Sequence, residues 1–254
     1  MGRRVIWLGG MSGVGKTTAA RRVARRYDLW LYSIDARTWK HAEAMRVPAL
    51  TMSPDEMWLE RSPEQMAQDF LDEADERFAL IKDEVAAIPD DGAPILVEGP
   101  QLPLGLEPAL YVVASPDLQR KLLAGRGSFT YSSTSDPERA FFNRIRRDEL
   151  LRERLLPHAI EIEDVTRTER IVESFVLEHV TVPAGGNAGA RRRYDNDAAI
   201  DQWRRYAEHE PRARELTIGF ACECDQPGCE SVVEVSFDRT IHRPFLGHRA
   251  TVRP

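Results

Sequence analysis

One segment near the start of the chain has the residue types and spacing of a phosphate-binding loop. It consists of Gly10, Met11, Ser12, Gly13, Val14, Gly15, Lys16 and Thr17, with Thr18 following. Glycine is needed where backbone amides turn inward around phosphate oxygens, because a side chain would block the approach and some positions need a positive φ. Lys16 would reach the β and γ phosphates, and Thr17 would ligate Mg²⁺. This Walker A pattern predicts binding of a nucleoside triphosphate together with Mg²⁺.

The segments on either side of the loop favour this function over a chance match in a glycine-rich turn. Residues 4–9 form an apolar run typical of a buried strand, and residues 16–27 carry small apolar residues at helical spacing. The amino end of that helix would add its positive dipole to the site. The chain has no Asn-Lys-x-Asp segment that would recognise guanine. We therefore expect the nucleotide to be ATP.

A carboxylate follows the second predicted strand. Residues 29–34 are a short apolar run, and Asp35 comes directly after it. The carboxyl ends of strands in an open parallel sheet face the ligand crevice, so Asp35 could accept a proton from a substrate hydroxyl. The alternative is that Asp35 caps a helix over residues 36–44.

A second carboxylate, Glu98, ends the apolar segment 94–98. In P-loop proteins an acid that ends such a strand holds Mg²⁺, usually through water. Glutamate stands here in place of aspartate. An ordinary strand-end carboxylate is therefore the alternative.

Three arginines are candidates for stabilising the charge that develops on a transferred phosphoryl group. Arg126 lies in residues 125–136, which have the small and polar composition of a flexible loop, and Arg144 and Arg147 lie on one face of the following helix. Together they predict a helical lid over the nucleotide. The alternative is solvated pairing with the neighbouring acids, which are Asp148, Glu149 and Glu153.

Elsewhere in the first 182 residues, predicted strands alternate with predicted helices. Helix starts are expected at Ser53, Ser62, Asp136 and Thr166, and further strands at residues 109–114 and 159–165. Ser53 and Ser62 each begin a capping box with proline in the first helical position. This alternation predicts an α/β, three-layer P-loop NTPase fold with a five-stranded parallel sheet.

The amino-acid composition of the chain changes after residue 182. Residues 183–193 combine proline, glycine, alanine and an arginine run without periodicity, which is typical of a linker. Residues 194–207 carry apolar residues at helical spacing and predict a docking helix. We expect residues 1–182 and 194–254 to be separate domains.

All the cysteines of the chain lie in this smaller unit. Three clustered cysteines indicate a metal rather than a disulfide framework, because an odd number cannot pair off. Three thiolates and one imidazole would form a tetrahedral zinc site that stabilises a unit too small to fold on apolar burial alone. The expected ligands are Cys222, Cys224, Cys229 and His248, with His242 in reserve. The alternative is three reduced thiols without a metal.

The overall composition limits the class of partner. The 254 residues are 42% hydrophobic and 30% charged, with a net charge of −6. Such a chain can bury a core but has no global attraction to nucleic acid. No apolar run approaches the roughly 20 residues that a membrane helix requires. We expect a cytoplasmic protein whose partners are ATP and a small molecule.

The first 182 residues resemble the nucleoside-monophosphate-kinase-like group of small-molecule P-loop kinases, near the gluconate, shikimate, chloramphenicol and 2-phosphoglycerate kinases. The segments that carry the resemblance are residues 10–18, Asp35, Glu98-Gly99-Pro100 and residues 143–148. It implies a substrate-binding helical insertion over residues 37–88 and an arginine lid over residues 125–156.

The tail resembles a short zinc-ribbon-like module that ends many actinobacterial proteins. The resemblance rests on Cys222-Glu223-Cys224, on Cys229 and on Gly247-His248.

The leading hypothesis is an ATP-dependent phosphotransferase that moves the γ-phosphoryl group to a hydroxyl of a sugar, nucleoside, hydroxy acid or antibiotic-like compound. In this hypothesis Lys16 and the arginines stabilise the transferred group, while Asp35 orients the acceptor. The alternative is a nucleotide-dependent regulatory or interaction protein in which triphosphate binding reorients the zinc-bearing tail and no acceptor is phosphorylated.

Overall fold

Five short apolar segments form a single parallel sheet. The computed structural model describes residues 4–45, 52–125, 133–181, 186–209, 211–240 and 246–247. The strands are β1 (Val5–Gly10), β2 (Trp30–Ser33), β3 (Ile95–Glu98), β4 (Ala109–Ala114) and β5 (Ile160–Ile162). Their order is β2-β3-β1-β4-β5, and all neighbours are parallel. The predicted five-stranded parallel sheet is confirmed, and β5 is shorter than the expected residues 159–165.

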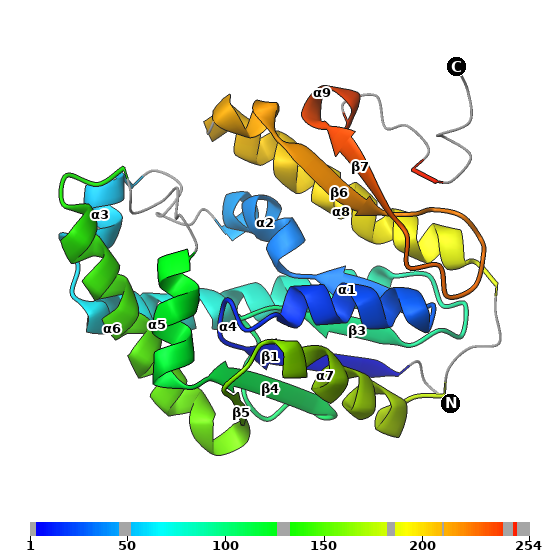
Figure 1. Cartoon of the computed structure of the whole chain (residues 1–254), viewed down its shortest axis with the longest axis horizontal. Coiled ribbons are helices and arrows are strands. Elements are labelled where there is room, and N and C mark those ends of the chain that lie inside the picture. Colours follow the sequence, from blue (N-terminus) through cyan, green and yellow to red (C-terminus); the bar gives the residue numbers. More distant parts are fainter. Residues whose placement is uncertain are drawn as a thin grey trace.

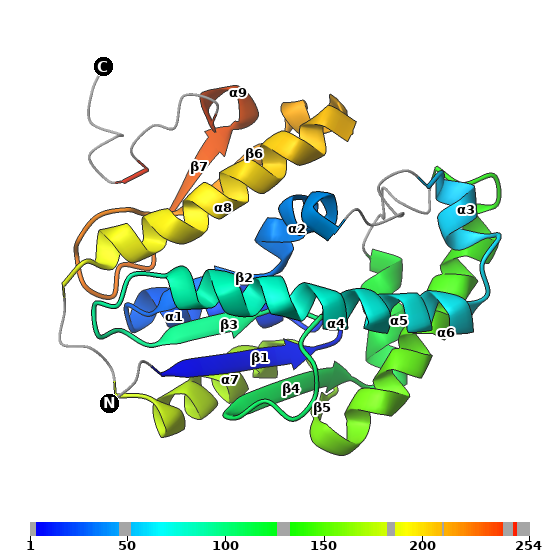
Figure 2. The same ribbon diagram turned by 180° about the vertical axis from the view of Figure 1, so that it is seen from behind.

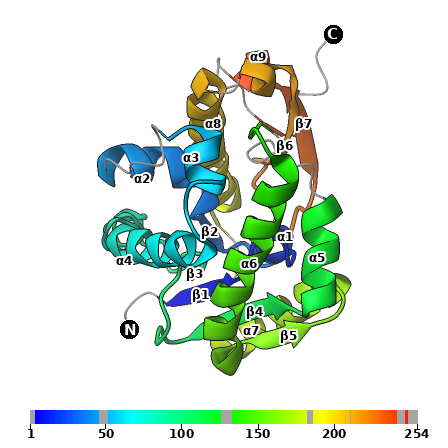
Figure 3. The same ribbon diagram turned by 90° about the vertical axis from the view of Figure 1, so that its left-hand side faces the viewer.

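Helices cover both faces of this sheet. Helices α1 (Lys16–Arg26) and α7 (Thr166–His179) lie on one face, and α4 (Pro63–Ala87) lies on the other (Figures 1 and 3). Successive side chains of a strand point to opposite faces. Ile6 and Leu8 accordingly pack in the α1 and α7 layer, whereas Trp7 packs in the α4 layer. This alternation produces the three-layer P-loop α/β fold.

Local capping signals determine where several of the helices begin. Ser53 starts α3 (Pro54–Trp58) and Ser62 starts α4 with complete capping boxes, as predicted. At α6 (Pro137–Leu155) the Asp136 side chain accepts a hydrogen bond from the Arg139 amide. Helix α7 begins at Thr166 as expected, but Asp164 rather than Thr166 accepts the amide hydrogen bond.

The remaining helices of this unit lie near the carboxyl ends of the strands. A short 3-10 helix (Asp35–Arg37) and α2 (Thr38–Met45) follow β2, and α5 (Pro116–Gly125) follows β4. In Figure 2 the arrows of β1 and β4 point toward the group formed by α3, α5 and α6. None of the helices in the described ranges has the length and apolarity to cross a membrane.

The tail consists of one long helix and a hairpin. The elements are α8 (Ala188–His209), a 3-10 helix (Pro211–Glu215), β6 (Thr217–Ala221), β7 (Val232–Ser236) and α9 (Phe237–Thr240). Strands β6 and β7 are antiparallel. Ile200, Phe220 and Val235 form a small core here that also includes Ala36 from the first unit. The tail therefore packs directly on the sheet-bearing unit, beside β2.

Helix α8 begins six residues earlier than the predicted helix 194–207, so the second half of the expected linker 183–193 is helical. The reason is that Arg191 and Arg192 are buried rather than solvated. Arg191 pairs with Asp91 at 2.8 Å, and Arg192 pairs with Asp28 at 2.5 Å. The local sequence indicates a linker because the acidic partners of these arginines lie 100 and 164 residues away in sequence.

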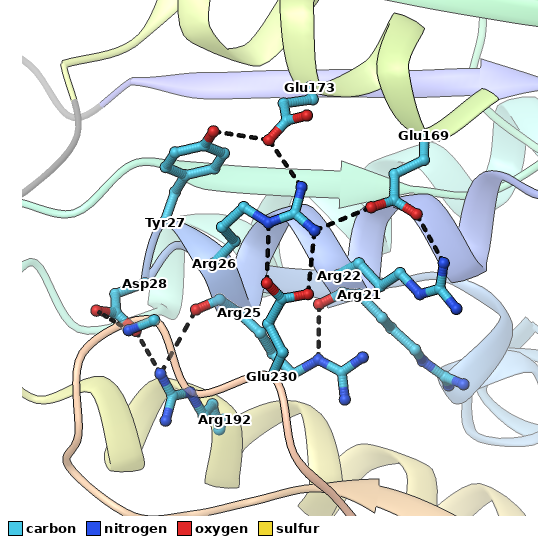
Figure 4. Close-up of polar contacts among 11 residues, drawn as sticks. Arg21, Arg22, Arg25, Arg26, Tyr27, Asp28, Glu169, Glu173, Arg192 and Glu230 are labelled. Carbon is cyan, nitrogen blue, oxygen red and sulfur yellow. Dashed lines mark hydrogen bonds and ion pairs between the residues drawn. The ribbon is translucent and has the colours of Figure 1, made fainter. Parts of the chain in front are cut away.

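Ionic contacts join the tail to the end of α1 (Figure 4). Asp28, which follows α1 with a φ of +50°, binds Arg192 of α8 and accepts a bond from the Gly228 amide at 3.2 Å. Arg26 pairs with Glu230 of the β6–β7 loop at 2.9 Å. Because the Asp28–Arg192 pair is almost fully buried, removing one partner leaves an uncompensated charge.

We predict that Asp28→Asn lowers the free energy of unfolding by about 2 to 4 kcal/mol, since Arg192 would lose its buried counter-charge. Asparagine keeps the side-chain shape and tolerates the positive φ. Urea unfolding followed by circular dichroism measures the change.

The matched control is Asp197→Asn, which breaks the half-exposed Arg193–Asp197 pair of α8. It should change stability by less than about 0.5 kcal/mol. Equal losses in the two variants would show that the buried pair has no special role in docking the tail.

Candidate nucleotide and acceptor site

The predicted phosphate loop connects β1 directly to α1. Gly10 and Gly15 have φ values of +118° and +84°. A Cβ atom on Gly10 would overlap the Val112 carbonyl of β4, so only glycine lets the loop start this close to the sheet. At the other end of the loop, the Val14 carbonyl accepts a hydrogen bond from the Thr168 hydroxyl at 2.7 Å. Contacts with β4 and α7 thus hold the loop in its conformation.

Most of the predicted nucleotide-binding residues line one polar hollow. It is lined by Ser12, Gly13, Gly15, Lys16, Thr17, Thr18, Asp35 and Pro100. The Lys16 side chain is buried, and its Nζ donates to the Met11 carbonyl at 2.5 Å. The first residues of α1 form part of the same hollow, so its amide groups and positive helix end face it. The hollow has the donors that a chain of phosphates requires.

Glu98 lies next to the first turn of α1. Its Oε1 accepts a hydrogen bond from the Thr17 hydroxyl at 2.8 Å, and its Oε2 accepts one from Ser33 at 3.4 Å. Burial, and secondarily the charge of Asp35, raise the pKa of Glu98 to about 7, while Lys16 acts in the opposite direction. A threonine hydroxyl beside a buried carboxylate is a donor set that suits Mg²⁺. The residues present fit that ion.

The Asp35 side chain is exposed at the edge of the hollow. Ile34, and not Asp35, occupies the cap position of the 3-10 helix Asp35–Arg37, and no side chain caps that helix. The alternative in which Asp35 caps a helix at this point is therefore wrong. Its carboxylate influences the pKa of Glu98 on one side and of Arg77 on the other. This position leaves it available to a molecule bound beside the phosphates.

Sequence reasoning missed a buried arginine beneath Asp35. Arg77 of α4 is 1% exposed. Its Nε donates to His41 Nδ1 at 2.9 Å, and its guanidinium also binds the Ile34 carbonyl at 3.3 Å and Gln101. These bonds hold the backbone that ends in Asp35. The signal was present in the sequence, because Arg77 lies between Ala74 and Ile81 on the apolar face of α4.

A second hollow adjoins the first and shares Ser12 and Pro100 with it. Its apolar lining comes mainly from α4, from the segment after β3 and from α6, and includes Phe70, Leu71, Ala74, Leu102, Leu104 and Leu151. Asp75, Arg147, Asp148 and Arg154 supply its charged groups. Its place beside the phosphate hollow suits a second substrate with an apolar body.

The predicted lid arginines pair with an acid in this structure. Arg144 binds Asp148 at 2.9 Å, Arg147 binds it at 2.6 Å, and both guanidinium groups lie 5.4 Å from the ring centre of Trp58. The alternative of pairing with a neighbouring acid thus holds for Asp148, but these pairs are not solvated, because the side chains of Arg144, Arg147 and Asp148 are only 17%, 14% and 6% exposed. Arg147 lines the second hollow, whereas Arg144 lines neither hollow. Arg126 lies outside the described residues.

The three cysteines of the tail lie close together. The Sγ atoms of Cys222, Cys224 and Cys229 are within 4.8 Å of one another, which fits thiolates around a single metal ion. Between them, the Glu223 amide donates to the Leu246 carbonyl at 2.5 Å, so the chain near residue 246 reaches the cluster. His248 and His242 lie outside the described residues.

Comparisons with known proteins yield distant structural likeness only. No protein family and no curated protein matches the sequence. Among solved structures, a shikimate kinase from Bacteroides thetaiotaomicron is 18% identical, with a TM-score of 0.39, and the match covers 69% of this chain and 98% of that one. An uncharacterized protein from Eubacterium ventriosum is 16% identical, with a TM-score of 0.34, over 68% and 98% of the two chains.

The raised pKa of Glu98 predicts a pH-dependent stability in the presence of EDTA. Because the pKa rises from 4.5 to about 7 on folding, the resulting stabilisation is complete below pH 4.5 and is lost as the pH rises through 7. The Glu98→Gln variant does not lose stability in this way, because glutamine does not ionise. The free energy of unfolding of the wild type, relative to that of Glu98→Gln, should therefore decrease by up to about 3 kcal/mol as the pH rises from 4.5 to 8. Thermal and urea unfolding across this range measure the difference.

The exposed Glu178→Gln of α7 serves as the control and should differ from wild type by a constant amount. If the difference in free energy of unfolding between wild type and Glu98→Gln were also independent of pH, the electrostatic account of this carboxylate would be contradicted.

Proposed function

We propose that this protein is a Mg²⁺-ATP-dependent phosphotransferase that acts on a hydroxyl group of a small molecule. The observation that carries the proposal is the Asp35 carboxylate, which forms no hydrogen bond through its side chain within the described ranges and lines the same hollow as Lys16 and Thr17. A purely nucleotide-binding loop has no need of a carboxylate there, whereas transfer to an alcohol requires a group that orients the hydroxyl and accepts its proton.

Each residue of the site has a separate role in the proposed reaction. Backbone amides of residues 10–18 and the Lys16 ammonium bind the triphosphate, and Thr17 with Glu98 would hold Mg²⁺, which neutralises phosphate charge when bound. The acceptor oxygen attacks the γ-phosphorus, its proton passes to Asp35, and ADP leaves. Arg77 positions Asp35 through the Ile34 carbonyl. Arg147, and with it Arg126 and Arg144, are the proposed cations for the transferred group.

The second hollow is the proposed acceptor site. Its leucine and phenylalanine side chains favour a molecule with an apolar body, and its charged residues would orient that body so that a hydroxyl reaches Asp35. Among the acceptors considered from sequence, this lining favours nucleosides and antibiotic-like compounds over small sugars.

For the tail we propose a structural zinc ion bound by Cys222, Cys224, Cys229 and His248, with His242 as the reserve ligand. Residues 194–254 would then be a small module attached to the kinase-like unit 1–182. A reducing compartment such as the cytoplasm would keep the thiols available to the metal.

A regulatory, non-transferring protein is the second candidate. The observation that favours it is that the tail binds the carboxyl end of α1, the helix whose amino end forms the phosphate loop. Movement of that helix on nucleotide binding would be transmitted to the tail.

We predict that Asp35→Asn lowers kcat by about 10²- to 10⁴-fold while the Kd for ATP changes little, because the variant keeps the phosphate contacts and loses the proton acceptor. Lys16→Ala, as the matched control, should weaken ATP binding itself. The acceptor is first found by screening nucleosides, antibiotic-like compounds, sugars and hydroxy acids with ATP, scored by the mass gain of one phosphoryl group.

Two results would contradict this proposal. Hydrolysis of ATP without mass gain on any acceptor would favour the regulatory protein, and full transfer by Asp35→Asn would exclude this carboxylate as the base.

The zinc site makes a separate prediction. Purified protein should contain about one zinc per chain, and Cys224→Ser should lose most of it together with several degrees of Tm, since metal binding adds directly to folding free energy. Elemental analysis and thermal unfolding measure both quantities. A native protein free of zinc would leave three reduced thiols as the correct description.

A further inference from the structure

A cavity of about 270 Å³ lies where the tail meets the first unit, on the α8 side of α1. Its walls come from α1, β2, α8, β6 and β7. Leu29, Leu31, Phe220, Ala221 and Val232 are among its apolar residues, and Arg21, Arg22, Arg25, Arg191, Arg192 and Asp195 carry its charges. The cavity touches the phosphate site only through Thr18 at the start of α1. A space of this size between charged walls can hold a small molecule.

The α1 wall carries two guanidinium groups, those of Arg21 and Arg25, that line the cavity. Arg22 pairs with Glu169 at 2.7 Å, on the α7 side of the helix. In Figure 4 the guanidinium groups of Arg21 and Arg25 point together to the other side, away from Glu169. Neither forms an ion pair with a carboxylate anywhere in the described ranges, and burial lowers the pKa of Arg25. Two adjacent guanidinium groups are a suitable site for a phosphate dianion.

The α8 wall carries a buried carboxyl group. Asp195 is 7% exposed, and its Oδ1 has no hydrogen-bond partner among the residues that the structure describes. Burial raises the pKa of Asp195, while Arg21, Arg37 and Arg25 act in the opposite direction, and no ion pair of Asp195 is found among the described residues. A buried acceptor without a donor is unfavourable by several kcal/mol in general, so groups of this kind usually face a ligand or water.

We propose that this cavity binds a small zwitterionic molecule, whose phosphate lies on Arg21 and Arg25 and whose protonated amine donates to Asp195. The apolar residues between the two walls contact the carbon atoms that join these groups. Such a ligand bridges α1 to β6, and it therefore also stabilises the docked position of the tail. The site is separate from the proposed phosphotransfer site and does not depend on that function.

The test compares two probes that differ only in the amine, phosphoethanolamine and ethyl phosphate, by isothermal titration calorimetry. The full-length Lys16→Ala protein is used, so that the phosphate loop contributes little. Phosphoethanolamine should bind about ten-fold more tightly than ethyl phosphate, because only its ammonium group satisfies Asp195. In Asp195→Asn this preference should disappear.

Three further variants test the phosphate contacts and the cavity. Arg21→Gln with Arg25→Gln should weaken both probes by at least about ten-fold, while Arg193→Gln on the exposed side of α8 should leave both affinities unchanged. Ala199→Leu, which fills the cavity and keeps its charges, should abolish binding of both probes while retaining the wild-type Tm. The Ala199→Leu variant tests the proposal even if the double arginine variant fails to fold.

Three outcomes would overturn the proposal. They are no binding of either probe at about 10 mM, the same preference for phosphoethanolamine in Asp195→Asn, and undiminished binding in a folded Ala199→Leu protein.

Discussion

The hydrogen bond from Thr17 to Glu98 joins parts of the chain that are 81 residues apart, and the arrangement of the whole site depends on it. The bond is possible because the sheet places Glu98 beside Leu8 of β1 and Ser33 of β2. Each of these strands then runs directly into a segment of the candidate site: β1 into residues 10–18, and β2 into Asp35. A shift of one residue in register would turn Glu98 away from Thr17. The apolar packing that fixes the register of the strands thus also determines which polar side chains meet at the candidate site.

Helix α1 connects three regions of the molecule through different faces. Its first turn belongs to the phosphate hollow, its apolar face packs on the sheet, and its arginines divide into two sets. Arg22 and Arg26 bind acids of α7, whereas Arg21 and Arg25 form no ion pair among the described residues and line the cavity beside the tail. Arg22 also lines this cavity, and Arg26 also binds Glu230 of the tail. A displacement of this helix would therefore disturb all three regions together.

The features that the sequence predicted well are those with local causes. Capping boxes at Ser53 and Ser62, the glycines of the phosphate loop and the apolar strands depend on residues within a few positions of one another. Arg77 and Arg192 were missed or misread because their partners, His41 and Asp28, become neighbours only when α4 and α8 pack on the sheet. A charged residue within an apolar helical stripe is the one local sign of such a contact. Whether Arg144 and Arg147 meet Asp148 or a phosphoryl group could not be read from spacing, since both arrangements use the same helix face.

The Asp28–Arg192 pair also has a consequence for how the protein is made. During synthesis Asp28 leaves the ribosome 164 residues before its partner. In that interval α1 ends in a carboxylate next to the negative end of its own dipole, which is an unfavourable arrangement. The sheet-bearing unit can collapse on its apolar core, but it acquires its final charge balance only when α8 emerges. A fragment that stops before Arg191 would keep residues 10–18 and still expose Asp28 and Asp91 without their cations, so the tail completes the charge balance of the sheet-bearing unit.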